Sequence, residues 1–319
     1  MSNKQNSGDI SVGVIGMGPV GMILAVKLKE AGFDVSVCVR NKVKREKIKS
    51  EGIVLENVIN STTSFNKVYG SIEEMAVNQY DFLFFSTKSY QTLDAAKEAE
   101  LLNSDRLTVV SAQNGIDVEE LLVPSFGESS ILRMIVNYAG NMTSPNTVRV
   151  TFFSPPNYIG SVDDSRSDQA SSIADALTNS DLETKDVSSF ELFKRTWEKT
   201  ILNASLSALC GVGRLTMAEA MADPDTLQLV EETINEGIDV AEKEKIHFEN
   251  DFLRKCLRYL KKGGDHFPSL AGDLINNRPT EIDYFNGKIV EYGKKHYVRT
   301  SLNLSMTNMV KAMTNKNVT

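Results

Sequence analysis

Short apolar runs alternate with longer segments of helical spacing in the first half of the chain. The run 11–15 is followed by a glycine-rich turn, a helical pattern that reaches Ala31, and a second apolar run at 35–39. This order of strand, turn, helix and strand is typical of the βαβ unit of a parallel sheet. Further strands are predicted at 80–86, 107–111 and 182–187, helices at 42–50, 90–103, 117–123 and 166–178, and strands at the far edge of the sheet at 130–136, 147–153 and 157–162.

The pattern changes after residue 188. From there to Lys316 nearly every segment has helical periodicity, with breaks at glycine, proline or threonine. A length of 319 residues with 41% hydrophobic content allows two cores. We therefore expect an α/β protein with an N-terminal Rossmann-type doubly wound sheet over residues 1–188, followed by an all-α domain over residues 189–319.

Charge argues against nucleic acid as a partner. The chain has 35 Lys and Arg against 42 Asp and Glu, a net charge of -7, and no dense basic run. The histidines and cysteines lack the spacing of a metal site or of paired disulfides, so we expect no metal and three reduced thiols.

Neither a leader nor a membrane span is expected. The first nine residues are polar, and the charge-free stretch 200–213 is shorter than the ~20 residues that span a bilayer. We therefore expect a cytoplasmic protein that does not insert into membranes.

The glycine-rich turn has the spacing of a dinucleotide-binding motif. In Gly16-Met17-Gly18-Pro19-Val20-Gly21, the first glycine allows the tight turn, the second lets a pyrophosphate approach the backbone, and the third allows helix to pack on strand. The helix N-terminus that follows presents partial positive charge to the phosphates. The motif alone is weak, but its position between strand and helix predicts a nucleotide site.

The end of the second strand indicates which nucleotide binds. An NAD enzyme would be expected to place an acidic residue there for the ribose 2′-hydroxyl, but this chain places Arg40, followed by more basic residues. This favours NADP(H), whose 2′-phosphate pairs well with arginine. The alternative is a solvated basic start of a helix.

Two later strands are each followed by a polar residue of interest. Lys88 follows the strand 80–86, and Asn114 follows the strand 107–111. Ligands in open α/β sheets bind outside the carboxyl ends of strands, which makes both candidates for cofactor contact. The alternatives are a solvated loop lysine and a simple Asn-Gly turn.

A polar face stands out at the start of the second half. Lys199, Asn203 and Ser207 fall on one face of a helix that is otherwise apolar from Thr200 to Gly213. An ammonium packed on apolar surface beside a nicotinamide can have a lowered pKa, and so stabilise an alkoxide and donate its proton. The alternative is a lysine that extends from the edge of a core helix to solvent.

Taken together, these features resemble ketopantoate reductase (2-dehydropantoate 2-reductase) over nearly the whole chain. The most specific matches are the Lys199/Asn203 helix and the segment Pro279-Thr-Glu281-Ile-Asp-Tyr-Phe-Asn-Gly287. The resemblance implies an NADPH-binding domain joined to a helical domain, with the active site in the cleft between them. It also implies NADPH-dependent reduction of 2-dehydropantoate to (R)-pantoate, a step in pantothenate and coenzyme A biosynthesis.

The resemblance also implies roles for single residues. Lys199 would be the proton donor and Glu281 would lie by cofactor and substrate; substrate would be bound by Asn203, Ser207, Ser269 and Asn114. Cofactor would be contacted by Lys88, Asn114, Ala139 and Glu281, besides Arg40 and the glycine turn. From the residues alone, Glu281 in the first turn of a helix beginning near Thr280 could serve only the helix dipole, and Ser269 could be only an N-cap.

Two positions depart from the family pattern. Ser207 and Met217 stand where the family usually has asparagines on the substrate side. A reductase of another 2-oxo acid is therefore an alternative, and a non-catalytic NADP-sensing protein is a third hypothesis. A homodimer and a monomer are both open alternatives, because periodicity does not separate packing within a domain from packing against a second copy.

Overall fold

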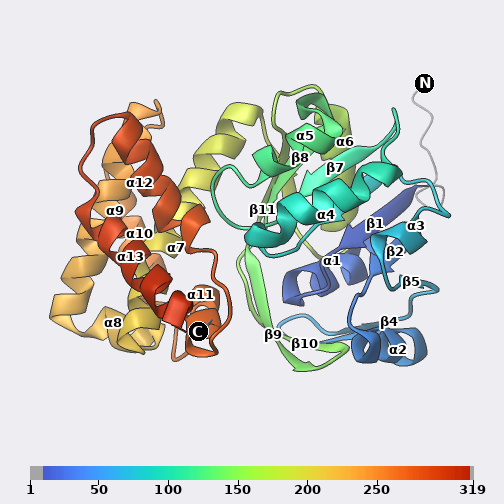
Figure 1. Ribbon diagram of the computed structural model, residues 1–319, viewed down its shortest axis with the longest axis horizontal. Helices are drawn as coiled ribbons and strands as arrows, with labels where there is room; N and C mark the ends of the chain where they lie inside the picture. The colour runs from blue at the N-terminus through green and yellow to red at the C-terminus, as the bar shows by residue number, and fades with distance from the viewer. Residues whose placement is uncertain (1–9, 317–319) are drawn as a thin grey trace. The chain divides into compact units, whose positions relative to one another are not determined.

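The computed structural model describes residues 10–316 of the chain. The chain divides into two units, one ending at Phe193 and the other beginning at Lys194. Strands with flanking helices make up the first unit, and helices make up the second (Figure 1). The predicted fold class, a largely parallel sheet followed by a helical region, is confirmed. The boundary falls inside helix α7 (Ser189–Gly213), which the sequence pattern assigns entirely to the second domain.

An eight-stranded sheet forms the centre of the first unit, in the order β12-β11-β8-β7-β6-β1-β2-β5. The six neighbouring strands β5-β2-β1-β6-β7-β8 all pair in parallel. Beyond them, β11 pairs antiparallel with β8, and β12 pairs in parallel with β11. The strands are β1 (Ser11–Ile15), β2 (Asp34–Cys38), β5 (Lys67–Tyr69), β6 (Phe82–Phe85), β7 (Thr108–Ser111), β8 (Ile131–Ile135), β11 (Asn157–Ser161) and β12 (Thr184–Asp186).

Helices cover both faces of this sheet. Successive side chains of a strand point to opposite faces, so Phe84 of β6 packs on one side whereas Leu83 and Phe85 pack on the other. The first side carries α1 (Pro19–Glu30) and α6 (Ser167–Thr178), and the second carries α3 (Ile72–Met75), α4 (Thr92–Ala99) and α5 (Val123–Phe126). Being buried on both faces, the central strands are continuous apolar runs, which is why the sequence reveals them.

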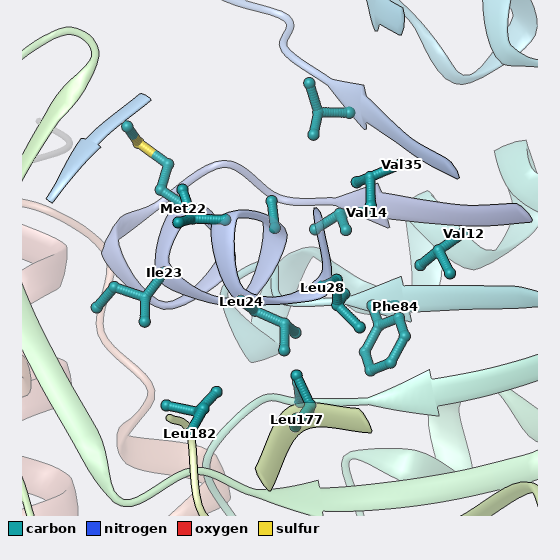
Figure 2. Close-up of a cluster of buried hydrophobic side chains, with 14 of the residues drawn as sticks. Val12, Val14, Met22, Ile23, Leu24, Leu28, Val35, Phe84, Leu177 and Leu182 are labelled. Atoms are coloured by element: carbon teal, nitrogen blue, oxygen red, sulfur yellow. The ribbon is translucent and has the colours of Figure 1, made fainter. Parts of the chain in front are cut away.

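A second sheet packs on α1, so that this helix contacts both sheets. It has four strands in the order β4-β3-β10-β9: β3 (Ile53–Asn57), β4 (Ser61–Thr63), β9 (Tyr138–Ser144) and β10 (Thr147–Phe153). Helix α1 contacts β1 and β2 of the large sheet and all four strands of the small one, and every residue from Gly21 to Leu28 is buried. Figure 2 shows the side chains of Leu24 and Leu28 directed towards Leu177 and Phe84, while the side chain of Met22 extends from the opposite side of the helix.

The small sheet corrects one prediction. Residues 147–153 do not lie at the edge of the large sheet but form β10, which pairs in parallel with β3 and antiparallel with β9. Val148 and Val150 of this strand are buried while Arg149 and Thr151 are exposed. That alternation is typical of a sheet with one solvated face, unlike the continuous apolar runs of the large sheet.

Helices joined by loops and one 3-10 turn make up the described part of the second unit. Trp197 of α7 is fully buried and packs edge-on against Tyr292, with ring centroids 5.2 Å apart. After α7 come α8 (Met217–Ala222), α9 (Pro224–Lys243), α10 (Phe252–Leu260), α11 (Ser269–Ile275), a 3-10 turn η6 (Ile282–Tyr284), α12 (Asn286–Lys295) and α13 (Ser301–Lys316). Within the described residues, none of the helices of either unit is both long and apolar enough to cross a membrane.

Candidate functional site

The glycine turn lies where the order of the large sheet reverses. Strand β1 has β2 on one side and β6 on the other, so the chain winds outwards in both directions from this point. In open α/β sheets, the crevice at the carboxyl ends of the two strands flanking such a reversal is the usual ligand site. Gly16 follows β1 there, and Ser86 follows β6.

Two glycines of the turn are required by close packing. Gly16 has a φ of +100°, and a Cβ placed on it would lie 2.4 Å from the backbone nitrogen of Thr87. A Cβ on Gly21 would lie 2.0 Å from the carbonyl oxygen of Gly16 and 2.3 Å from the Ser86 hydroxyl oxygen. That hydroxyl donates to the Gly16 carbonyl oxygen at 2.7 Å. The turn is therefore fixed against the end of β6.

The middle glycine is different because it faces open space. A Cβ on Gly18 would meet no atom of the described residues within 4 Å. Gly18 directly precedes α1, whose first residue is Pro19, and its carbonyl accepts the first helical bond from Met22 at 2.9 Å. An uncovered backbone at a helix N-terminus is what a pyrophosphate requires, so these residues fit a dinucleotide. Met17 and Val20 complete the turn, Met17 buried and Val20 half-buried.

Basic side chains gather at the end of β2. Arg40 is exposed, and its guanidinium forms an ion pair with Glu98 of α4 at 2.7 Å. Asn41 caps α2 (Lys42–Glu51) by accepting from the Lys44 amide at 2.9 Å. The Lys44 ammonium donates to the Met17 carbonyl oxygen at 2.8 Å, and burial lowers the pKa of this lysine. The structure thus singles out Lys44, which the sequence shows only as one of several basic residues, as the cation beside the glycine turn.

The loops after β6 and β7 are tied together. Lys88 precedes the 3-10 turn η2 (Ser89–Gln91), and the hydroxyl of Ser89 donates to the Asn114 carbonyl oxygen at 2.9 Å. The Gln113 side-chain amide donates to Thr92 at 2.8 Å. Both Lys88 and Asn114 are half-buried. The structure therefore brings the loops carrying these two predicted residues side by side at the carboxyl edge of the sheet.

Sequence reasoning missed Arg133, which lies beneath the second of these loops. It is the third residue of β8, is 2% exposed, and forms an ion pair with Glu119 at 3.0 Å. The signal was present in the sequence, because an arginine between apolar neighbours in a buried strand is rare unless it is paired.

Ala139 lies on β9 of the small sheet, beside α1. Its neighbour Tyr138 is buried with its hydroxyl 3.5 Å from the Val20 carbonyl oxygen, and burial raises the pKa of that tyrosine. Ala139 itself is exposed. Of these two residues, Tyr138 has its side chain directed towards the glycine turn.

In the second unit, α7 carries the predicted polar face. Lys199, Asn203 and Ser207 follow one another at intervals of four residues, with the first two half-buried and Ser207 buried. Ser207 lies deeper in the core than an open substrate face would require, and so extends the polar stripe into the packed part of the helix.

A buried asparagine joins the segment carrying Glu281 to this helix. The Asn286 amide donates to the Ala204 carbonyl oxygen of α7 and to the Asn303 side-chain oxygen, both at 3.0 Å. Glu281 is only 5% exposed and stands immediately before η6, not in the first turn of an α-helix, because α12 begins at Asn286. Helix-dipole compensation is therefore a weaker explanation for Glu281 than the sequence indicates.

The other two positions lie around the end of α7. Ser269 is exposed at the first residue of α11, a helix in which Ala271 lies against Gly211 of α7. Met217 opens α8, and its side chain packs against Gly263. No group of three or more metal-ligating side chains occurs within residues 10–316.

Two models of one protein family match the chain, one in each unit. The family model "Ketopantoate reductase PanE/ApbA" matches residues 12–164, and "Ketopantoate reductase PanE/ApbA C terminal" matches residues 191–314. The 2-dehydropantoate 2-reductase of Aquifex aeolicus is 28% identical over 309 residues, covering 94% of this chain and 95% of that protein.

Two solved structures share the fold. A ternary structure of D-mandelate dehydrogenase with NADH and anilino(oxo)acetate is similar with a TM-score of 0.86 at 23% identity, covering 97% of this chain and 99% of that one. A dimeric ketopantoate reductase from Staphylococcus aureus has a TM-score of 0.80 at 20% identity, covering 97% of this chain and 100% of that one. Because the two family models match consecutive parts of the chain and describe one family, the chain belongs to the ketopantoate reductase family.

Proposed function

We propose that this protein reduces 2-dehydropantoate to (R)-pantoate with NADPH. One observation carries the proposal: α7 presents Lys199 one turn before Asn203 on a half-buried face, in a chain whose other unit has an open glycine turn at a sheet reversal. The lysine and asparagine suit a reaction that creates negative charge on oxygen, and the glycine turn suits the nucleotide that drives it.

The residues of the first unit would hold the cofactor. The α1 N-terminus at Gly18 would face the pyrophosphate, and Arg40 and Lys44 supply positive charge for the 2′-phosphate. When bound, NADPH supplies a hydride from C4 of its nicotinamide. Lys88 and Asn114 follow the adjacent strands β6 and β7, where we place cofactor contacts, with the Asn114 amide also available to substrate.

The residues of the second unit would handle the substrate and the proton. As hydride adds to the carbonyl carbon of the 2-oxo acid, the C=O π electrons move to oxygen, and the Lys199 ammonium gives its proton to that oxygen. Asn203 and Ser269 would hydrogen-bond the substrate's carboxylate or hydroxyl, and Glu281 would orient the reacting groups. The balance is one hydride and one proton added to one ketone.

Steady-state kinetics on Lys199 variants would test this mechanism. Lys199→Ala should lower kcat by about 10²–10⁴-fold with little change in the Kd for NADPH, since only the proton donor is lost. Asn235→Ala, an exposed change on α9, serves as the matched control. An undiminished rate in Lys199→Ala would remove the lysine from the mechanism.

A second candidate is reduction of a different 2-oxo acid. Two observations favour it: Ser207 is buried and Met217 packs on Gly263, where the family usually has asparagines. A protein of similar fold, D-mandelate dehydrogenase, was solved with NADH and anilino(oxo)acetate, which supports including aromatic 2-oxo acids among the substrates tested. Assays of the purified protein with NADPH and NADH against a panel of 2-oxo acids distinguish the two candidates. If ketopantoate ranks far below another acid in kcat/KM, the first candidate is rejected.

We also propose that the protein forms a homodimer. The support is the dimeric ketopantoate reductase from Staphylococcus aureus, whose chain is covered over its full length. Light scattering at micromolar concentration tests this, and a mass of one chain, 35.3 kDa, would contradict it.

A further inference from the structure

Arg133 places a guanidinium in the interior of the large sheet. It lies on β8 between β7 and β11 and is 2% exposed. One terminal nitrogen donates to the Ser111 hydroxyl and to the Glu119 carboxylate, both at 3.0 Å, and the other donates to the Gly115 carbonyl oxygen at 2.9 Å. Its Nε is buried without a hydrogen-bond partner among the described residues.

All three partners belong to one segment, residues 111–119. Ser111 ends β7, Gly115 has a φ of +111° in the middle of the loop, and Glu119 begins the 3-10 turn η4 (Glu119–Leu121). Asn114 lies between the first two of these attachment points. A single planar group therefore holds the loop at its start, its middle and its end.

The same loop is held from its other side by neutral side chains. The Ser111 hydroxyl donates to the Gln113 side-chain oxygen at 2.7 Å, and the Gln113 amide donates to Thr92 at 2.8 Å. The Ser89 hydroxyl reaches the Asn114 carbonyl oxygen at 2.9 Å. The carbonyl oxygens of Asn114 and Gly115 are thus bonded from opposite sides of the loop, which fixes the backbone that carries the Asn114 side-chain amide.

Stability alone does not account for a buried arginine at this position. Desolvation of a buried ion pair commonly offsets its attraction, and well-packed apolar replacements of both partners are often equally stable. The arrangement does, however, impose geometry, because a guanidinium has five donors in a rigid plane, which a lysine ammonium does not reproduce.

We propose that Arg133 is a positioning residue that sets the orientation of Asn114 towards the cofactor. The guanidinium charge is balanced by the half-buried Glu119, so Arg133 acts through the shape of the loop and touches neither cofactor nor substrate. The inference rests on the proposed nicotinamide cofactor but not on the identity of the 2-oxo acid.

Cofactor affinity measured by fluorescence titration tests the proposal independently of turnover. Arg133→Lys and the charge-free pair Arg133→Met/Glu119→Met should each raise the Kd for NADPH about fivefold to tenfold, the effect of losing one neutral hydrogen bond at Asn114. Arg166→Met is the matched control, because Arg166 donates to Thr108 at the opposite end of β7. That variant should bind NADPH within twofold of the unchanged protein.

A double-mutant cycle separates positioning from general stabilisation. In an Asn114→Ala background, Arg133→Lys should change the Kd for NADPH less than twofold, since its effect runs through Asn114. Additive losses would overturn the proposal, as would unchanged affinity in a folded Arg133→Lys protein. If that protein does not fold, Glu119→Gln, which keeps an acceptor oxygen, should show the same non-additivity with a smaller loss, and additivity there overturns it too.

Failure of the proposed function would look different. Loss of ketopantoate reduction with intact NADPH binding leaves this cycle fully measurable. Conversely, additive losses would reject the role of Arg133 and leave the reductase assignment intact.

Discussion

Gly18 and Gly21 are three residues apart in one motif, yet the structure predicts opposite results when each is changed to alanine. The backbone of Gly18 has φ −78° and ψ −174°, an extended conformation open to any residue, and an added Cβ meets no described atom within 4 Å. The added Cβ of Gly21 would lie 2.0 Å from a backbone oxygen. The first methyl group would intrude only on a ligand, and the second would intrude on the protein.

The magnitudes follow from these distances. In Gly18→Ala two small effects oppose each other. Alanine is a less favourable N-cap than glycine, which destabilises the folded protein, but it also lowers the entropy of the unfolded chain, which stabilises it. The free energy of unfolding should therefore change by less than about 1 kcal/mol. The Kd for NADPH should rise at least about tenfold, or 1.4 kcal/mol, because the pyrophosphate can no longer approach the backbone. In Gly21→Ala, α1 must move off the turn, which should cost about 3 kcal/mol of stability.

Urea unfolding gives the stability of both variants, and titration of NADPH fluorescence gives their affinity. Ala25→Gly, inside α1, is a control for changing helix propensity without touching the turn. The reasoning would be refuted by a Gly18→Ala protein that binds NADPH as tightly as the unchanged protein, or by one that loses as much stability as Gly21→Ala.

Four further predictions concern other parts of the molecule. Arg40→Ala should weaken NADPH binding at least about tenfold more than NADH binding, because a charge-assisted hydrogen bond is worth about 1.5–3 kcal/mol; equal losses in parallel titrations would contradict the role. Glu98→Gln should do the reverse and strengthen NADPH binding, since it frees the Arg40 guanidinium from a carboxylate 2.7 Å away. Asn286→Ala should lower the free energy of unfolding, measured by urea titration, by about 2–3 kcal/mol, because it removes two buried hydrogen bonds. A loss below about 0.5 kcal/mol would show that these hydrogen bonds contribute little to stability. Burial raises the pKa of Cys38 to about 11 and those of the other two thiols to about 12, so at pH 8 all three stay protonated and a disulfide reagent should label them only after unfolding. Rapid labelling of one thiol in the native protein would contradict this.

The sequence predicted the strands buried on both faces, because unbroken apolar runs such as 82–85 have one interpretation at that length. It did not predict β4, β5 and β9, which are short or largely polar, nor β3, whose apolar start Ile53-Val-Leu55 runs into Glu56 and Asn57. All four are held by their partners in a sheet. The predicted helix 90–103 is a short α-helix between two 3-10 turns for a related reason, since loop contacts decide its ends.

The candidate site residues differ in the same way between those that a local pattern predicts and those that depend on distant contacts. The tight turn at Gly16, Gly18 and Gly21 could be predicted because the spacing of the three glycines reports backbone geometry directly. The sequence marks Arg133 only as an unusual charge in an apolar strand and Lys44 only as one of several basic residues, because the partners of these two side chains, such as Gly115 and Met17, are distant in sequence.

Helix α1 has no solvent-facing side between Gly21 and Leu28, and even Lys27 is buried, paired at 2.8 Å with Glu30. Its amide hydrogens should accordingly be among the slowest to exchange in the first unit, since they are released only when both sheets open. The nucleotide would then meet a surface that is already ordered before binding. Little of its binding free energy would be spent on folding the phosphate site, and the entropy lost on binding would fall mainly on exposed side chains such as Arg40.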